Sequence, residues 1–289
     1  DTQLVRLAVL SEQTRLAAEQ GARFIVWPEL SFGFDPQVEH TAELQALAVE
    51  TNAYILIGYG VVTPADEWRN EAILLTPSGE FAFVYGKNYP SEPGEPPTVT
   101  RGSYPVLKTE IGNLSTIICN DVNFTITTRT LARNGAQIIA EPTFEIGAPG
   151  LGWEERTQTV LRAVENHVVV VKAEAAGINM IVDPYGRIVA HEVVPAGTAH
   201  ALIADVPLGA SRRAARHFQQ RNAAGQIQLP GAARKERGIA RRVQQRPAPE
   251  LKIQAGVDEQ LGPLDLEHIA RFGLDEVRVE LRRGDRFDV

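Results

Sequence analysis

Residues 114–140 read LSTIICNDVNFTITTRTLARNGAQIIA and contain a strand, a turn, a helix and a second strand in close succession. The apolar run at residues 114–118 is typical of a short buried strand, and it ends at Cys119. Residues 127–134 predict a helix that a glycine closes, and residues 137–140 predict the next strand. Strands that alternate with helices in this way indicate a layered α/β fold.

The same alternation continues on both sides of this stretch. The first helix is predicted to end near Gly21, with an apolar face formed by Leu4, Val5, Ala8, Val9, Leu16 and Ala17. Two further helices are predicted at residues 41–51 and 154–166. Other strands are predicted at residues 23–27, 53–62, 72–76, 81–85, 168–173, 178–182, 187–190 and 201–206. The turn residues at 77–79 and 183–186 should join neighbouring strands into hairpins, so we expect mixed sheets.

Composition excludes several classes of protein. The 289 residues are 44% apolar and 22% charged, which is enough for one sizeable core and too apolar for a disordered chain. There is no run of about 18 apolar residues, so we expect no membrane-spanning helix. A single cysteine allows neither an intramolecular disulfide nor a cysteine-built zinc site. The six histidines are scattered without ligand spacing, so we expect no metal and no cofactor.

Charge divides the chain into three parts. Residues 1–209 carry 13 basic and 25 acidic side chains, and we interpret them as the catalytic body. Residues 210–246 carry 10 basic side chains and one acidic side chain and are interpreted as a basic linker or tail. Residues 247–289 form a small C-terminal element. The basic part could be a solvated linker, contact an anionic membrane or nucleic acid, or bind the acidic body of a partner subunit. The net charge of −7 argues against nucleic acid as the partner of the whole chain.

Four residues at strand ends or in the loop that follows one suggest chemistry. Cys119 precedes a turn where backbone amides can gather around an anion, but a thiol needs a base or a cation to act as a nucleophile. Glu29 follows the predicted strand in Trp-Pro-Glu, and Lys87 follows another strand, eight residues before Glu95. Taken singly, each residue has an ordinary alternative: a small buried side chain, a helix cap, or a surface lysine.

Together these residues resemble the signature of the nitrilase, or carbon–nitrogen hydrolase, superfamily. The sequence around them is similar to the family's motifs as well, over roughly residues 12–207. The matching segments are Ile-Ile-Cys-Asn-Asp at 117–121, Phe124, Arg129, Gly-Ala at 135–136, Glu-Pro-Thr at 141–143, Arg-Ala-Val-Glu-Asn at 162–166, and Asp-Pro-x-Gly at 183–186.

The resemblance implies a four-layer α-β-β-α sandwich and a role for each residue. Glu29 would take the thiol proton, Cys119 would attack the substrate carbon, and Lys87 would hold the oxyanion. Glu95 would support Lys87. Substrate contacts are expected from Asn120, Phe124, Thr143 and Phe144, with the backbone N–H of Asn120 as a second oxyanion donor.

The sequence also departs from the family's pattern. The family begins with a strand, whereas this sequence begins in a helical pattern, so we expect the sheet to lack that strand and to have an open edge. Asn120 stands where an aromatic residue is usual, and Asn179 replaces a serine. Residues 172–174 read Lys-Ala-Glu where the family commonly has Asn. We interpret these changes as shifts of substrate preference or of local packing.

The predicted function is hydrolysis of a non-peptide carbon–nitrogen bond in an amide-like substrate. Asp121, two residues after the cysteine, favours amidases and carbamoylases over nitrile-cleaving and acyltransferase members. One alternative is an N-acyltransferase of the apolipoprotein N-acyltransferase type, cut from a membrane protein, which would take a small acyl substrate. Another alternative is a non-enzymatic scaffold. By resemblance we expect a homodimer. The single cysteine and the lack of a leader favour the cytoplasm, with membrane association as the alternative for an excised domain.

Overall fold

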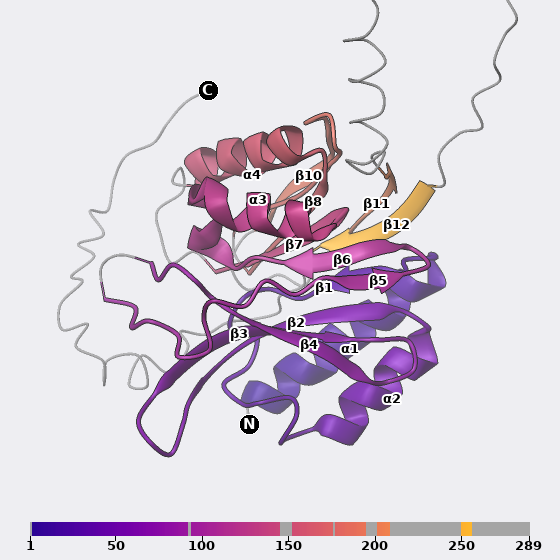
Figure 1. The fold of residues 1–289 in the computed structure, drawn as a ribbon. Coiled ribbons are helices and arrows are strands. Elements are labelled where there is room, and N and C mark those ends of the chain that lie inside the picture. Colours follow the sequence, from indigo (N-terminus) through magenta and orange to yellow (C-terminus); the bar gives the residue numbers. More distant parts are fainter. Residues whose placement is uncertain are drawn as a thin grey trace, which may run out of the picture.

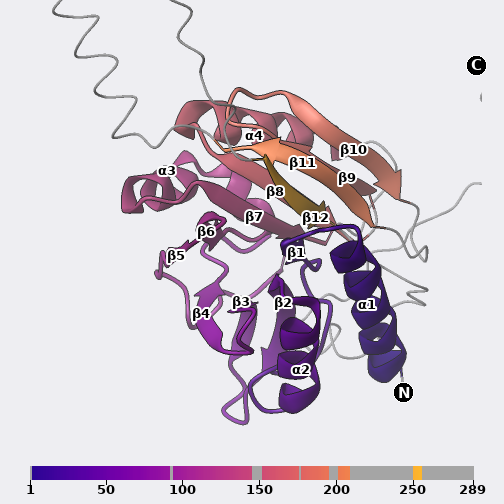
Figure 2. The same cartoon turned by 90° about the vertical axis from the view of Figure 1, so that its right-hand side faces the viewer.

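Two sheets packed face to face form the centre of the molecule. The computed structural model describes residues 2–91, 94–144, 152–175, 177–194, 201–208 and 250–255. Helices α1 and α2 cover the outer face of one sheet, and α3 and α4 cover the outer face of the other (Figure 1, Figure 2). The expected four-layer α-β-β-α sandwich with mixed sheets is therefore confirmed.

The first sheet has the strand order β11-β12-β1-β2-β3-β4 and the second has β10-β9-β8-β7-β6-β5. The strands are β1 Phe24–Val26, β2 Tyr54–Val62, β3 Trp68–Leu75, β4 Phe81–Gly86, β5 Leu107–Thr109, β6 Gly112–Thr116, β7 Ile138–Thr143, β8 Val169–Glu174, β9 Gly177–Val182, β10 Ile188–Val194, β11 Leu202–Pro207 and β12 Glu250–Ala255. The helices are α1 Thr2–Glu19, α2 Thr41–Thr51, α3 Thr125–Asn134 and α4 Gly152–Asn166, with a 3-10 turn η1 at Cys119–Asn123. Every helix and strand predicted for the catalytic body is present, whereas the basic linker or tail at residues 210–246 lies outside the described residues.

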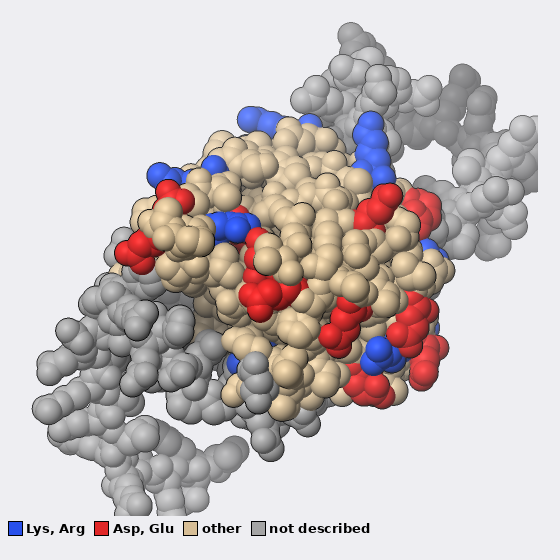
Figure 3. All heavy atoms as spheres, turned by 90° about the horizontal axis from the view of Figure 1, so that it is seen from below, with Lys and Arg blue, Asp and Glu red and all other residues tan. Residues whose placement is uncertain are grey.

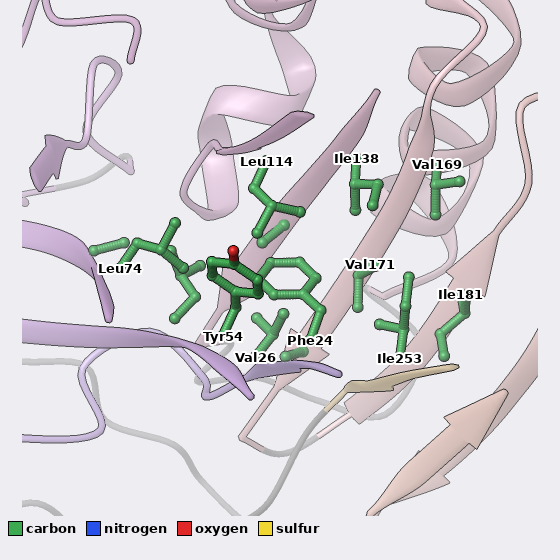
Figure 4. Packing of buried hydrophobic residues seen from close by; sticks show 14 of the residues in the cluster. Phe24, Val26, Tyr54, Leu74, Leu114, Ile138, Val169, Val171, Ile181 and Ile253 are labelled. Carbon is green, nitrogen blue, oxygen red and sulfur yellow. The ribbon is translucent and has the colours of Figure 1, made fainter. Parts of the chain in front are cut away.

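The apolar side chains divide into three layers because strand residues alternate between the two faces of a sheet. On β2, Tyr54 and Leu56 face the second sheet, whereas Ile55 and Ile57 face α1 and α2. Figure 4 shows the layer between the sheets, where side chains from both sheets meet. A third layer packs the second sheet against α3 and α4. On the outside, the face in Figure 3 carries acidic side chains at both sides and near its centre, with more of them toward the right and fewer basic ones among them.

Helix α1 is present, but the apolar face predicted for it is wrong. Of the six residues expected on that face only Ala17 is buried, and Leu4, Val5 and Leu16 are exposed. The helix instead packs through a different stripe, formed by Arg6, Leu7, Leu10, Ser11, Thr14 and Ala17. Polar contacts select this stripe, because Thr14 Oγ1 accepts a hydrogen bond from the indole of the buried Trp27, at 3.0 Å.

The first described element is the helix α1, as the sequence predicted, but the open sheet edge expected from the lack of a strand before it is not found at β1. Strand β12 pairs parallel with β1, with Phe24 opposite Ile253, and antiparallel with β11. Strand β1 is therefore hydrogen-bonded on both sides, to β12 and β2. Residues 250–255 belong to the stretch that the sequence suggested as a separate C-terminal element, and they supply a strand inside the sheet of the body.

Shortening Ile253 tests the contribution of β12 to the core. Its side chain is fully buried between the sheets, so Ile253→Ala should lower the free energy of unfolding by about 2–5 kcal/mol. The matched control is Ile126→Ala on α3, where the side chain is 45% exposed and the loss should be much smaller. Urea denaturation of the full chain measures both. Equal losses would contradict the position of β12 in the core.

Candidate active site

Three segments distant in sequence bring polar side chains to one end of the layer between the sheets. Glu29 follows β1, Lys87 follows β4 directly, and Glu95 lies in the loop after Lys87. Cys119 begins η1 after β6, and its thiol packs at the end of the apolar cluster between the sheets. The structure therefore places together the four residues that the sequence singled out.

The ammonium of Lys87 is the centre of this cluster. Lys87 Nζ donates to Glu29 Oε1 at 2.9 Å, to Glu95 Oε2 at 2.7 Å and to Ser91 Oγ at 3.0 Å. The lysine side chain is only 2% exposed. Burial by itself lowers the pKa of a lysine, but the neighbouring charges of Glu29, Cys119 and Glu95 outweigh it. The pKa of Lys87 is therefore raised above its ordinary value, and the group stays a cation.

The two carboxylates are held in different ways. Both oxygens of Glu29 are bonded: Oε1 accepts from Lys87, and Oε2 accepts from the backbone N–H of Phe144 at 2.9 Å. Glu95 Oε2 also accepts from the backbone N–H of Ser91, at 2.7 Å. Burial raises the pKa of Glu95, but the charge and hydrogen bond of Lys87 outweigh this effect and the pKa is lowered. Glu95 is thus an anion that supports Lys87.

Sequence reasoning missed Asn70, which joins the two carboxylates. Its Nδ2 donates to Glu29 Oε1 at 2.7 Å and to Glu95 Oε1 at 2.6 Å. Asn70 lies on β3, on the same face as Ala72 and Leu74, which pack between the sheets. A polar residue at an inward position of an otherwise apolar strand was the signal that could have identified it.

The backbone after Glu29 is fixed by close contacts. Arg6 of α1 is buried and donates to the carbonyl of Ser31 at 2.9 Å. On the other side, Gly58 of β2 lies so near that a Cβ there would come within 2.3 Å of the Pro28 carbonyl. The position of Glu29 therefore depends on a glycine that lets β2 approach and on a guanidinium that holds the loop.

Cys119 sits in a strained turn. It adopts a left-handed conformation with φ of 45°, which is costly for a residue with a Cβ and is often found at functional sites. Its side chain is 4% exposed. Ser91 Oγ lies 4.0 Å from Cys119 Sγ, and the same oxygen contacts Lys87. One hydroxyl group therefore lies within hydrogen-bonding distance of both the ammonium and the sulfur.

Asp121 connects the cysteine turn to the lysine loop. Its carboxylate accepts hydrogen bonds from the backbone N–H of Ile118 and Tyr89 and from the hydroxyl of Tyr85, at 3.1, 2.8 and 2.7 Å. The side chain is fully buried. Burial raises the pKa of Asp121 to about 6, although these hydrogen bonds act in the opposite direction. The sequence analysis interpreted Asp121 only as an indicator of substrate type. In the structure its carboxylate links the turn of Cys119 to the loop after Lys87.

The four residues expected to contact substrate have definite partners within the protein. Asn120 Nδ2 donates to the Pro90 carbonyl at 2.8 Å, and Phe124 stacks on Tyr89 with 3.7 Å between ring centroids. The other two lie at the end of β7. The hydroxyl of Thr143 is buried and donates to the Glu141 carbonyl at 3.3 Å, and Phe144 holds Glu29 through its backbone, as described above. Their contact with substrate stays a prediction.

The departure at residues 172–174 produces a buried ion pair. Lys172 Nζ lies 3.1 Å from Glu174 Oε2, and both side chains are fully buried. Asn179, the other departure, accepts a hydrogen bond from the backbone N–H of Glu174 at 2.6 Å. These unusual residues therefore contact one another, in line with a change of local packing.

The described parts of the chain contain neither a cluster of metal ligands nor a membrane-spanning helix. Among those residues, no three His, Cys, Asp or Glu side chains gather in a way that could hold a metal ion. None of the helices in the described ranges has both the length and the apolar character needed to cross a bilayer.

Solved structures show to which class this fold belongs. The chain is similar to the crystal structure of an amidase from Nesterenkonia sp., with 25% identity and a TM-score of 0.58, covering 68% of this chain and 82% of that one. It shares its fold with a carbon–nitrogen hydrolase from Helicobacter pylori, at 16% identity and a TM-score of 0.57, covering 67% of this chain and 82% of that one. The fold is that of the nitrilase superfamily.

Comparison of the sequence with a family model shows to which family the chain belongs. The model for carbon-nitrogen hydrolase matches residues 3–216, so the chain belongs to the carbon–nitrogen hydrolase family, which is a family of enzymes. Curated relatives include a deaminated glutathione amidase from Synechocystis sp., 29% identical over 224 residues that cover 65% of this chain and 82% of that protein.

In two other relatives the region that matches this chain is only part of the protein. A nitrilase from Pyrococcus abyssi is 28% identical over 182 residues, which cover 56% of this chain and 65% of that protein. An apolipoprotein N-acyltransferase from Geobacter metallireducens is 25% identical over 208 residues, which cover 63% of this chain and 40% of that protein. The matched region thus spans less than two thirds of either relative.

The raised pKa of Asp121 predicts a pH-dependent stability. Because its folded pKa of about 6 lies above the ordinary 3.8, the folded state binds this proton more tightly than the unfolded chain. The resulting stabilisation is complete below about pH 4 and is lost as the pH rises through about 6. The unfolding free energy of wild type minus that of Asp121→Asn should fall by on the order of 1–3 kcal/mol over this range. Urea denaturation at several pH values measures it, and a constant difference would contradict the titration.

Proposed function

We propose that the chain hydrolyses a non-peptide carbon–nitrogen bond of an amide-like substrate through an acyl-enzyme on Cys119. The observation that carries the proposal is the buried ammonium of Lys87, which Glu29, Glu95 and Ser91 hold beside the thiol. A fixed cation next to a nucleophile is what the developing oxyanion of an acyl-transfer reaction requires. Membership of the carbon–nitrogen hydrolase family and the similarity to amidases support the same chemistry.

In the first half of the reaction, Glu29 takes the thiol proton and Cys119 attacks the carbonyl carbon of the amide. The carbonyl oxygen becomes an oxyanion, which Lys87 and the backbone N–H of Asn120 stabilise. Each such donor contributes about 3–4 kcal/mol in comparable sites. The carbon–nitrogen bond then breaks, the proton held by Glu29 goes to the leaving nitrogen, and ammonia or an amine departs.

In the second half, water replaces the departed amine. Glu29 takes a proton from this water, and the hydroxide attacks the thioester carbon. The carbon–sulfur bond breaks, the acid is released, and the proton returns to the sulfur. Because the pKa of Lys87 is raised above its ordinary value, the group is a cation at neutral pH in both halves of the reaction. Glu95 and Asn70 hold Lys87 and Glu29 in place and exchange no proton.

The second candidate is acyl transfer, in which an amine in place of water intercepts the same thioester. The similarity to apolipoprotein N-acyltransferase over 208 residues favours it. The two outcomes differ only after the thioester has formed. Supplying an amine acceptor together with the amide substrate separates them, since transfer yields a new amide and hydrolysis yields the free acid.

The acyl-enzyme can be tested by intact mass, because Cys119 is the only cysteine in the chain. Small amides should add an acyl mass to the wild type and none to Cys119→Ala, which should lose ammonia release at least about 1,000-fold. Glu29→Gln should lower turnover by a similar factor. Its matched control, Glu50→Gln, changes an exposed glutamate and should leave turnover unchanged. Ammonia release that survives in Cys119→Ala would overturn the proposal.

The proposal also includes a homodimer, which rests on the resemblance, and a cytoplasmic location, which rests on the single cysteine. Gel filtration with light scattering measures the mass of the full chain in solution. A mass of one chain over the working range of concentration would overturn the dimer.

A further inference from the structure

Ser91 is a polar residue that helps to hold Lys87, and neither the sequence nor the mechanism gives it a role toward Cys119. Its hydroxyl lies 3.0 Å from Lys87 Nζ and 4.0 Å from Cys119 Sγ, the latter at the long end of hydrogen-bonding distances to sulfur. Its backbone N–H donates to Glu95. The side chain is half-buried. No other side-chain hydroxyl among the described residues has hydrogen bonds to both the ammonium and the sulfur.

The loop that carries Ser91 is attached to the turn that carries the sulfur. Asp121 accepts from the backbone of Asn88 and Tyr89, at 3.1 and 2.8 Å. Asn120 donates to the Pro90 carbonyl, and Phe124 stacks on Tyr89. Residues 88–90 thus contact the turn at three places, so the hydroxyl of Ser91 is positioned relative to Cys119 by the turn itself.

The direction of the two hydrogen bonds follows from the groups involved. An ammonium can only donate, so Ser91 Oγ is the acceptor of the bond from Lys87. A thiolate can only accept, so the hydroxyl proton of Ser91 points to the sulfur once Cys119 has lost its proton. An oxygen that accepts from a cation is also a better donor, because hydrogen bonds in a chain polarise one another.

We propose that Ser91 is a positioning residue that transmits the charge of Lys87 to Cys119 by donating a hydrogen bond to the thiolate. This inference rests on the proposed function, in which the thiolate is the nucleophile. It assigns the loop after Lys87 a second task besides supplying Glu95, namely to stabilise the reactive form of the sulfur before substrate attack.

The test measures the pH dependence of a reaction at the sulfur that needs no substrate. Methyl methanethiosulfonate is small, neutral and not an amide, and its reaction with the full chain reports on Cys119 alone because no other cysteine is present. In Ser91→Ala the midpoint of the rate profile should move to higher pH by about one unit, and the rate below the midpoint should fall about tenfold. In Ser91→Thr, which keeps a hydroxyl, the profile should stay near that of the wild type.

The matched control is Ser115→Ala. Ser115 lies on β6, the strand that leads to Cys119, and its buried hydroxyl donates to the Pro105 carbonyl at 2.6 Å. Loss of this hydrogen bond should lower stability without moving the midpoint. Superimposed profiles for the wild type and Ser91→Ala would overturn the proposal. Equal shifts in Ser91→Ala and Ser115→Ala, or a Ser91→Thr profile like that of Ser91→Ala, would also overturn it.

The outcome is independent of substrate turnover, so it separates this inference from the proposed function. A midpoint shift in a chain that forms no acyl-enzyme with amides would support the role of Ser91 and overturn the amide chemistry. With an active chain, Ser91→Ala should lower kcat about tenfold and change KM little, because the lost interaction acts on the nucleophile.

Discussion

The buried charge of Lys87 is the constraint around which this end of the sandwich is arranged. An ammonium that is 2% exposed costs several kcal/mol unless opposite charges and hydrogen bonds compensate it. Its compensating groups come from the end of β1 and from the loop after β4, so folding must bring these parts together before the charge is stable. The glycine at position 58, the guanidinium of Arg6 and the carboxylate of Asp121 fix the backbone in the places that this compensation requires.

The cluster also explains why an uncharged residue holds two charged ones. Asn70 donates to both Glu29 and Glu95 and adds no charge of its own. A second cation in its place would compete with Lys87 for the same oxygens, whereas an apolar residue would leave two carboxylate oxygens with fewer donors. An amide therefore gives each acid a hydrogen-bond donor and adds no second cation beside the ammonium.

Much of this arrangement could be predicted from the sequence, because the local patterns are strong. Runs of β-branched residues identified the strands, Gly and Pro identified the turns, and the positions of Glu29, Lys87 and Cys119 at strand ends indicated a site. The parts that could not be predicted depend on contacts between distant residues. The buried stripe of α1 follows from Trp27 and Ser31, which select Thr14 and Arg6 over the more apolar Leu4 and Leu16. The pairing of β12 with β1 joins residues more than 200 positions apart, and no periodicity of the sequence reports such a neighbour.

That pairing has a consequence for how the chain is made. During synthesis on the ribosome, β1 emerges early, and its neighbour β12 is added only after most of the remaining residues. Until then the backbone groups on one side of β1 are unpaired, and one side of the apolar layer is exposed to solvent. Contacts of such long sequence separation slow folding, and a nascent chain with an exposed strand is prone to aggregate. Until β12 has been made, β1 is therefore an edge strand of the nascent sheet, although it is an inner strand of the finished one.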